Sequence, residues 1–141
     1  MFIDPSIAVA SLGLTPQMLY QDFETFGFLF ENVCYRDLKI YSSALGGTLS
    51  YYRDRMNLKV DGVLHLHDGR YALIEFKLSS KQIEQAATHL RQVSALIQQA
   101  NKVNPHGKIP EPTLLMIITG GDMAYTRKDG IKIIPIGCLR D

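Results

Sequence analysis

Two stretches in the middle of the chain alternate apolar and polar side chains as half-buried strands do. In residues 58–66 the even-numbered positions are apolar or glycine, whereas the odd-numbered positions include Asp61. Residues 71–78 behave likewise, and there Glu75 and Lys77 share a face because they are two positions apart. The pattern predicts two neighbouring strands joined by a short turn.

The length of this turn decides whether Asp61 lies on the same face as Glu75, because a slip of one residue moves a strand's side chains to the other face. A two-residue loop, Asp68-Gly69, would pair Asp61 with Phe76 and separate the two carboxylates. A three-residue loop over 67–69 pairs Asp61 with Glu75, brings both apolar sets to one face, and needs a left-handed residue where Gly69 stands. We predict the three-residue loop.

The residues before the hairpin predict helices and one strand. Residues 4–14 contain an Asp-Pro-Ser turn that favours a short helix, and Thr15 followed by Pro16 is a typical helix start. Apolar residues then follow helical spacing from position 17 to about 44, where Gly27 either divides the helix or allows close packing. A glycine pair ends this helix, and residues 48–53 alternate as a strand.

After the hairpin, residues 81–102 carry a single apolar stripe and predict a helix that covers the sheet, with His89 among its solvent-facing polar residues. The continuous apolar run 113–119 predicts a buried strand, parallel to the Glu75 strand through a right-handed crossover. Residues 124–136 predict a last hairpin. The expected fold is α/β: an antiparallel three-strand meander, a covering helix, a parallel strand and a terminal hairpin, with helices on both faces of a mixed sheet.

In the predicted register Asp61 and Glu75 stand directly opposite, with Cβ atoms about 5 Å apart, which destabilises a sheet unless a positive charge intervenes. Magnesium or manganese would supply that charge, since hard divalent ions are held by one or two carboxylates plus substrate phosphate. Lys77, on the same face, would contact a phosphate oxygen or orient water. Lys59 falls opposite Lys77, a second like-charged pair that suits an acidic or anionic surrounding. The arrangement predicts phosphodiester hydrolysis.

The same residues also fit structural interpretations. Asp61, Glu75 and Lys77 also fit a solvated strand face with a cross-strand ion pair. Glu31 has small or apolar neighbours along its helix face, so its carboxylate needs a partner. That partner is either Arg36 or Tyr35 at the surface, or the acidic site itself.

The motif Val60-Asp61-Gly62-Val63, followed by Ile74-Glu75-Phe76-Lys77, resembles the Asp and Glu-x-Lys core of the PD-(D/E)XK, restriction-endonuclease-like nuclease superfamily. A longer stretch, from residues 27–32 to Ile118-Thr119-Gly120-Gly121, is similar to the uncharacterised C-terminal domain attached to prokaryotic AAA-type ATP-binding proteins.

The resemblance implies a restriction-endonuclease-like fold and places Glu31, Asp61, Glu75 and Lys77 at active-site positions. In this hypothesis Asp61 and Glu75 ligate magnesium or manganese with help from the Phe76 carbonyl. Lys77 stabilises the charged transition state or activates water, and Glu31 supports the site.

A chain of 141 residues suffices for one domain but not for a nuclease domain and an ATPase. No Gly-x-x-x-x-Gly-Lys-Ser/Thr phosphate loop occurs, so the ATPase implied by the resemblance is expected to be absent or separately encoded. Residues 1–14 are expected to be a linker from that N-terminal region, and residues 15–141 the nuclease-like domain.

Composition narrows the setting. The formal charge is +1 with scattered basic residues, which counts against tight autonomous DNA binding. The only cysteines, Cys34 and Cys138, show no paired metal spacing and suit a reducing cytoplasm, and no apolar run approaches about 20 residues. His65 and His67 look like a zinc pair, but His65 lies about 13 Å along the strand from Asp61 and is expected at the hairpin end.

Two functions follow. The first is a metal-dependent nuclease acting on DNA. The second is a catalytically silent binding or regulatory module of the same fold, in contact with an ATPase region, a partner or a second copy of the chain. A third class, an enzyme with a Cys or His nucleophile, is disfavoured because neither cysteine has a recognisable basic partner in the sequence.

Overall fold

The computed structural model describes residues 4–139, so the first three residues of the expected 1–14 linker and the last two of the expected 15–141 domain lie outside the described residues. Its elements, in chain order, are α1 (Pro5–Leu12), α2 (Pro16–Gln21), α3 (Phe23–Ala44), β1 (Thr48–Arg53), β2 (Lys59–His65), β3 (Tyr71–Lys77), η1 (Ser80–Gln82), α4 (Ile83–Val103), β4 (Leu114–Thr119), β5 (Tyr125–Thr126), β6 (Lys132–Pro135) and η2 (Ile136–Cys138).

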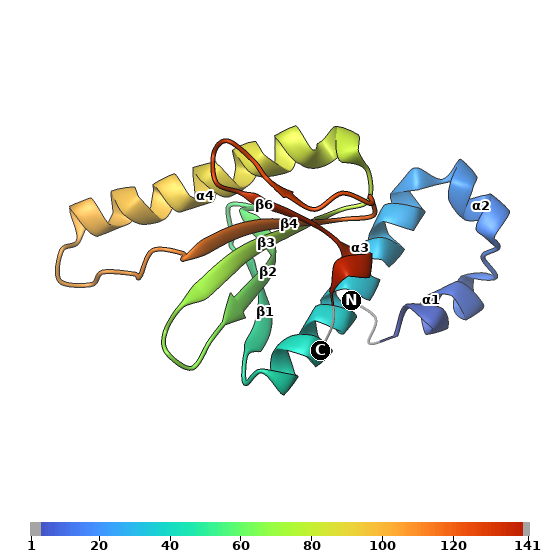
Figure 1. Ribbon diagram of the computed structural model, residues 1–141, viewed down its shortest axis with the longest axis horizontal. Helices are drawn as coiled ribbons and strands as arrows, with labels where there is room; N and C mark the ends of the chain where they lie inside the picture. Colours follow the sequence, from blue (N-terminus) through green and yellow to red (C-terminus); the bar gives the residue numbers. More distant parts are fainter. Residues whose placement is uncertain (1–3, 140–141) are drawn as a thin grey trace.

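The strands form one mixed six-stranded sheet in the order β1-β2-β3-β4-β6-β5 (Figure 1). Strands β1, β2 and β3 form the predicted antiparallel meander, and β4 returns parallel to β3 after α4. β6 adds parallel to β4 and pairs antiparallel with β5 around the predicted terminal turn. The α/β class and the order of its elements are therefore confirmed.

Helices α3 and α4 cover opposite faces of the sheet, as predicted. On one face Phe30 and Leu38 of α3 pack with Ile74 and Phe76 of β3. On the other face Leu90 of α4 packs with strand residues that include Leu73. Strand β3 is buried along almost its whole length because it lies between the two helices.

The first long helix divides at Asp22, so the alternative in which Gly27 divides it is wrong. Asp22 ends α2 and caps α3, because its carboxylate accepts hydrogen bonds from the Thr25 N–H at 3.1 Å and the Thr25 hydroxyl at 2.6 Å. The cap stabilises a helix start at this point by about 1 kcal/mol, which offsets the cost of about 1 kcal/mol for glycine in the helix interior. Gly27 therefore remains within α3.

The N-terminal helix α1 packs against α3. Asp4 caps it, as the Asp-Pro-Ser turn predicts, and also lies 3.6 Å from the guanidinium of Arg36. Ala8 is fully buried. Helix α2, in contrast, has no buried residue.

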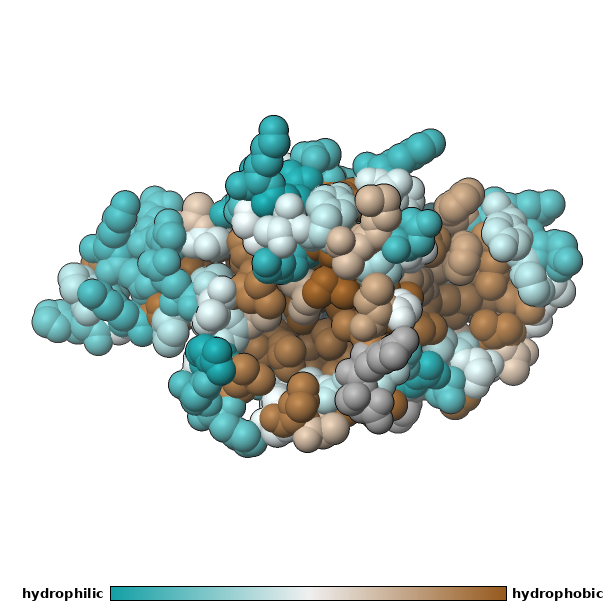
Figure 2. Space-filling view, viewed as in Figure 1, coloured by the Kyte–Doolittle hydropathy of each residue, from teal (hydrophilic) through white to brown (hydrophobic). Residues whose placement is uncertain are grey.

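Exposed apolar side chains gather over α1, α2 and the start of α3 (Figure 2). The largest of them, each about half exposed or more, are Ile7, Leu12, Met18, Tyr20, Phe23 and Phe28. We call these six residues the N-terminal apolar surface. Among residues 4–139 no helix is both long enough and apolar enough to cross a membrane.

Candidate active site

The register of the central hairpin is the one that the three-residue loop predicts. The Leu66 N–H donates to the Arg70 carbonyl at 2.9 Å, and the paired residues continue to Gly62 opposite Ile74. Gly69 adopts the left-handed conformation, with φ of 87°. The regular pairing ends one residue before Asp61 and Glu75, the two acids of the predicted site, and both of them line one cavity.

A β-bulge in β2 separates this point from regular pairing. Between Ser50 and Tyr52 of β1 the chain advances two residues, while the partner on β2 changes from Val63 to Val60, an advance of three. The extra residue lies at Asp61 or Gly62, where the regular pairing with β3 also ends. Bulges bend a strand and redirect side chains, and they are frequent beside active sites.

The bulge corrects the predicted faces of Leu58 and Val60. Strict alternation placed both with Leu64 on the α3 face, but they pack in the cluster formed with α4. An inserted residue reverses the alternation of everything that precedes it in the strand. Apolar residues on both sides of the insertion concealed this reversal in the sequence.

The Asp61 side chain contacts the backbone of β3 at the point where the pairing of β2 with β3 ends. The Phe76 N–H donates to the Asp61 carboxylate at 3.1 Å, so that Asp61 takes the place of a strand partner. The N–H and C=O of one residue leave a strand on the same side. The Phe76 carbonyl, the predicted backbone ligand, therefore points toward β2 as well.

Asp61 and Glu75 are buried, with exposed fractions of 5% and 4%, so the interpretation of a solvated strand face is wrong. Each acid pairs with a lysine two residues away on its own strand. Lys59 Nζ lies 2.9 Å from Asp61 Oδ1, and Lys77 Nζ lies 3.4 Å from Glu75 Oε2. Each of the two buried acids thus has a lysine ammonium group within ion-pairing distance.

Glu31 of α3 reaches this group through Lys59, whose Nζ lies 3.4 Å from Glu31 Oε2. The alternative partners are occupied elsewhere: Arg36 pairs with Asp37 at 2.8 Å, and the Tyr35 hydroxyl donates to the Leu49 carbonyl at 3.3 Å. The structure therefore brings together all four predicted site residues, with Lys59 joining Glu31 to Asp61.

The electrostatics follow from burial. Burial first, and then the negative charge of Asp61, raise the pKa of Glu75 to about 8, although Lys77 opposes this shift. Burial and the charge of Asp61 also raise the pKa of Glu31. Burial lowers the pKa of Lys59, but its hydrogen bond to Asp61 and the charges of Asp61 and Glu31 outweigh burial and raise it.

Helix α4 supplies two polar residues that the sequence analysis did not assign to the site. His89 Nδ1 lies 3.0 Å from Glu75 Oε1, so His89, which is 31% exposed, faces the site as well as the expected solvent. Gln85, one turn earlier, lines the same cavity of about 250 Å³ with Asp61 and Lys77. The sequence contained one signal for this. Gln85 and His89 are four residues apart and therefore share a helix face, and Ala86, between them in the sequence, belongs to the buried stripe of α4.

The donor set suits a hard cation only in part. Two facing carboxylates and a neighbouring carbonyl are oxygen ligands, and magnesium sites commonly complete their coordination with water and phosphate. Among residues 4–139, however, no group of three or more His, Cys, Asp and Glu side chains is placed to hold a metal ion. Lys59 lies between Glu31 and Asp61, so Glu31 does not extend the pair.

The histidines of the hairpin and the two cysteines are not among the residues that line the acidic cavity. His65 stacks on Tyr71 with ring centroids 5.3 Å apart, near the hairpin end as expected. Cys34 is buried and Cys138 exposed, and both are free thiols. Burial and nearby carboxylates raise the pKa of Cys34, which makes it a poor nucleophile.

Comparison with known protein families matches residues 26–139 to a family described as a domain of unknown function (DUF4143). No curated protein and no solved structure matches the chain. The matched range contains all four predicted site residues and His89.

Proposed function

We propose that this chain, which belongs to the DUF4143 family of domains of unknown function, is a metal-dependent nuclease-like domain that hydrolyses phosphodiester bonds. One observation carries the proposal. Asp61 and Glu75 are buried side by side where β2 leaves β3, with Lys77 on the same strand and in the same cavity. Burying two acids side by side costs free energy, and their position at a bulge favours a functional role.

The proposed fold is the restriction-endonuclease-like class. Three features support it: the meander β1-β2-β3, the parallel return of β4 after α4, and the placement of α3 and α4 on opposite faces. In this assignment Glu31 comes from the helix before the meander and Asp61 from the second strand. Glu75 and Lys77 come from the third.

Each residue has a separate role. Asp61 and Glu75, with the Phe76 carbonyl, would hold magnesium or manganese, and the bound cation would supply positive charge at the scissile phosphate. Lys77 moves from Glu75 to a phosphate oxygen once the carboxylate has another counter-charge, or it orients the attacking water. Glu31 keeps Lys59 within reach of the same phosphate.

Two observations favour the second candidate, a catalytically silent module of the same fold. Lysine ammonium groups already occupy positions beside both acids, at 2.9 Å from Asp61 and 3.4 Å from Glu75. The N-terminal apolar surface consists of six large apolar side chains that are each about half exposed or more, and exposed apolar patches mark contacts with other proteins. Its partner would be an ATPase region, joined through residues 1–14 or separately encoded, or a second copy of the chain.

Cleavage and metal binding, measured on the same preparations, test the proposal. Linear DNA is incubated with the protein and manganese, and manganese affinity is measured by calorimetry. Asp61→Asn and Glu75→Gln should each reduce cleavage by about a hundredfold or more and weaken manganese binding. Glu24→Gln, an exposed carboxylate of α3, is the matched control and should change neither.

The outcomes separate the two functions. Cleavage that persists in both Asp61→Asn and Glu75→Gln comes from a contaminant and overturns the nuclease assignment. Manganese binding without cleavage of DNA or RNA supports the silent module with an intact site. Absence of both binding and cleavage supports a module in which Lys59 and Lys77 have replaced the metal.

A further inference from the structure

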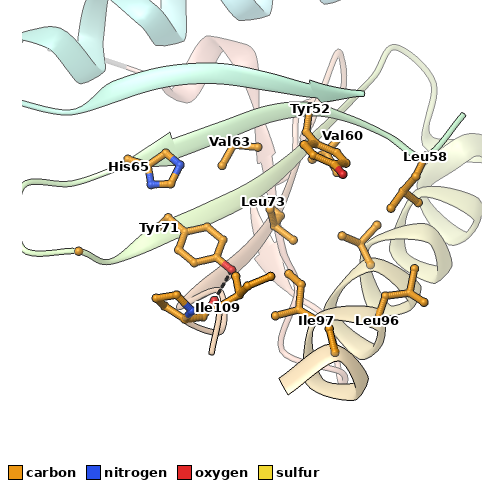
Figure 3. A pocket seen from close by; sticks show the side chains of 14 residues that line it. Tyr52, Leu58, Val60, Val63, His65, Tyr71, Leu73, Leu96, Ile97 and Ile109 are labelled. Atoms are coloured by element: carbon orange, nitrogen blue, oxygen red, sulfur yellow. Dashed lines mark hydrogen bonds between the residues drawn. The ribbon is translucent and has the colours of Figure 1, made fainter. Parts of the chain in front are cut away.

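A second, larger cavity lies between the hairpin and the C-terminal half of α4. It has a volume of about 440 Å³ and opens to solvent (Figure 3). Val63 and Leu73 form its floor on the sheet, and Leu96 and Ile97 of α4 face them across the gap. The N-terminal half of α4 is packed tightly on the sheet, with Leu90 fully buried, whereas Leu96 is 48% exposed. The apolar stripe of α4 therefore continues past the point where the helix touches the sheet.

The walls of this cavity are mostly apolar. None of the residues that line this cavity carries an Asp, Glu, Lys or Arg side chain. The Tyr71 hydroxyl donates to the Pro110 carbonyl, which holds the 109–110 segment at the rim and uses the donor of this tyrosine (Figure 3). The remaining side-chain polar groups of the lining are the Tyr52 hydroxyl and the His65 ring.

We infer that this cavity is a binding site for a small, uncharged, flat aromatic molecule. Its volume lies in the range of small-molecule pockets, about 300–1,000 Å³. Uncharged walls exclude a charged ligand, because desolvated charge would find no partner there. Three ring side chains, Tyr52, His65 and Tyr71, line the cavity, and aromatic rings prefer stacked or edge-to-face contact with another ring.

The cavity is separate from the acidic site but shares strand β2 with it. Leu58 and Val60 line the apolar cavity, whereas Lys59 and Asp61 line the acidic one. The β-bulge is responsible, because it turns Leu58 and Val60 to the α4 face. The proposed ligand site does not depend on nuclease activity.

The test uses 1-naphthol, an uncharged fused-ring probe, titrated into the ¹⁵N-labelled protein. Amide shifts are expected on β2, β3 and the second half of α4. The chain has no tryptophan, and Ala100→Trp places one in the cavity from an exposed helix position. This variant should bind 1-naphthol at least about tenfold more weakly, since a filled pocket leaves no room.

Ala95→Trp is the matched control, because Ala95 is equally exposed on the same helix but does not line the cavity. It should bind as the unchanged protein does, and circular dichroism checks that both variants fold. If Ala100→Trp is unfolded, the smaller Ala100→Phe takes its place. Equal binding by both tryptophan variants, or shifts confined to the N-terminal apolar surface, overturns the inference. A concentration-dependent dimer that Ala100→Trp dissociates, without 1-naphthol binding, also overturns it and assigns this face to a second copy of the chain.

Discussion

His89 Nδ1 lies 3.0 Å from Glu75 Oε1. The other carboxylate oxygen of Glu75 faces Lys77 Nζ at 3.4 Å, so the two oxygens have different partners from different elements. Strand β3 supplies the lysine and helix α4 the histidine. The orientation of Glu75 therefore depends on the packing of α4 against the sheet.

His89→Ala is expected to weaken manganese binding about tenfold, because outer residues that orient a metal-binding carboxylate typically contribute that much. His89→Gln retains a polar group of similar reach and should restore most of the affinity. Calorimetry with manganese measures both. His106→Ala, at an exposed loop histidine, is the control and should have no effect. An unchanged affinity in His89→Ala would assign His89 a purely structural role.

The raised pKa of Glu75 gives stability a defined dependence on pH. The folded protein keeps a proton on Glu75 up to about pH 8, whereas the unfolded chain releases it near 4.5. The folded state thus binds more protons between these values, and the free energy of unfolding falls as pH rises, by at most about 1.4 kcal/mol per unit. Glu31, whose pKa is also raised, contributes in the same direction.

Urea unfolding of the metal-free protein at several pH values between 5 and 9 checks this slope. Glu75→Gln cannot ionise at that position, so its stability should change less with pH and exceed that of the unchanged protein near pH 8. The exposed carboxylate variant Glu24→Gln should keep the original slope. A Glu75→Gln profile parallel to that of the unchanged protein would show that Glu75 is ionised throughout.

The hairpin register could be predicted because two local signals agree: strand alternation fixes the faces, and Gly69 fixes the turn. The break at Asp22 is also present in the sequence as an Asp-x-x-Thr cap, whereas Gly27, a residue disfavoured in helix interiors, indicates a break at the wrong position. Local chemistry was sufficient in both cases.

The bulge and the role of His89 could not be predicted in this way. Leu58 and Val60 are apolar and suit either face, so only the packing of the whole sheet reveals the reversal. His89 contacts Glu75 because of how α4 lies on the sheet, a relationship between residues 14 apart that helical periodicity does not contain. Both the bulge and the His89–Glu75 contact depend on how the strands and α4 pack together in the folded chain.

Gly120 and Gly121 follow β4 and offer a matched pair. A Cβ at Gly120 would lie 2.9 Å from the Leu78 carbonyl oxygen, a backbone atom just beyond Lys77. Gly120→Ala is therefore expected to destabilise the protein by about 1–3 kcal/mol in urea unfolding. The nearest atom to a Cβ at Gly121 is 3.4 Å away, so Gly121→Ala should be neutral or slightly stabilising. Equal stabilities would show that the end of β3 moves freely away from Gly120.

Lys59→Met tests whether a lysine competes with the proposed cation. Its ammonium group lies between Asp61 and Glu31, where a positive charge opposes the approach of another. Removing this charge should strengthen manganese binding about tenfold. The expected effect is smaller than for a buried charge, because Lys59 is half-exposed and solvent screens its charge. Stability without metal should fall, because two acids lose their counter-charge.

Calorimetry at pH 8.5 is the appropriate measurement, since Glu75 is then largely ionised and its proton no longer opposes binding. Lys39→Met, at an exposed position of α3, is the control and should leave the affinity unchanged. If Lys59→Met instead weakens manganese binding, Lys59 must hold Asp61 in the geometry that the cation needs, and competition between the two positive charges is excluded.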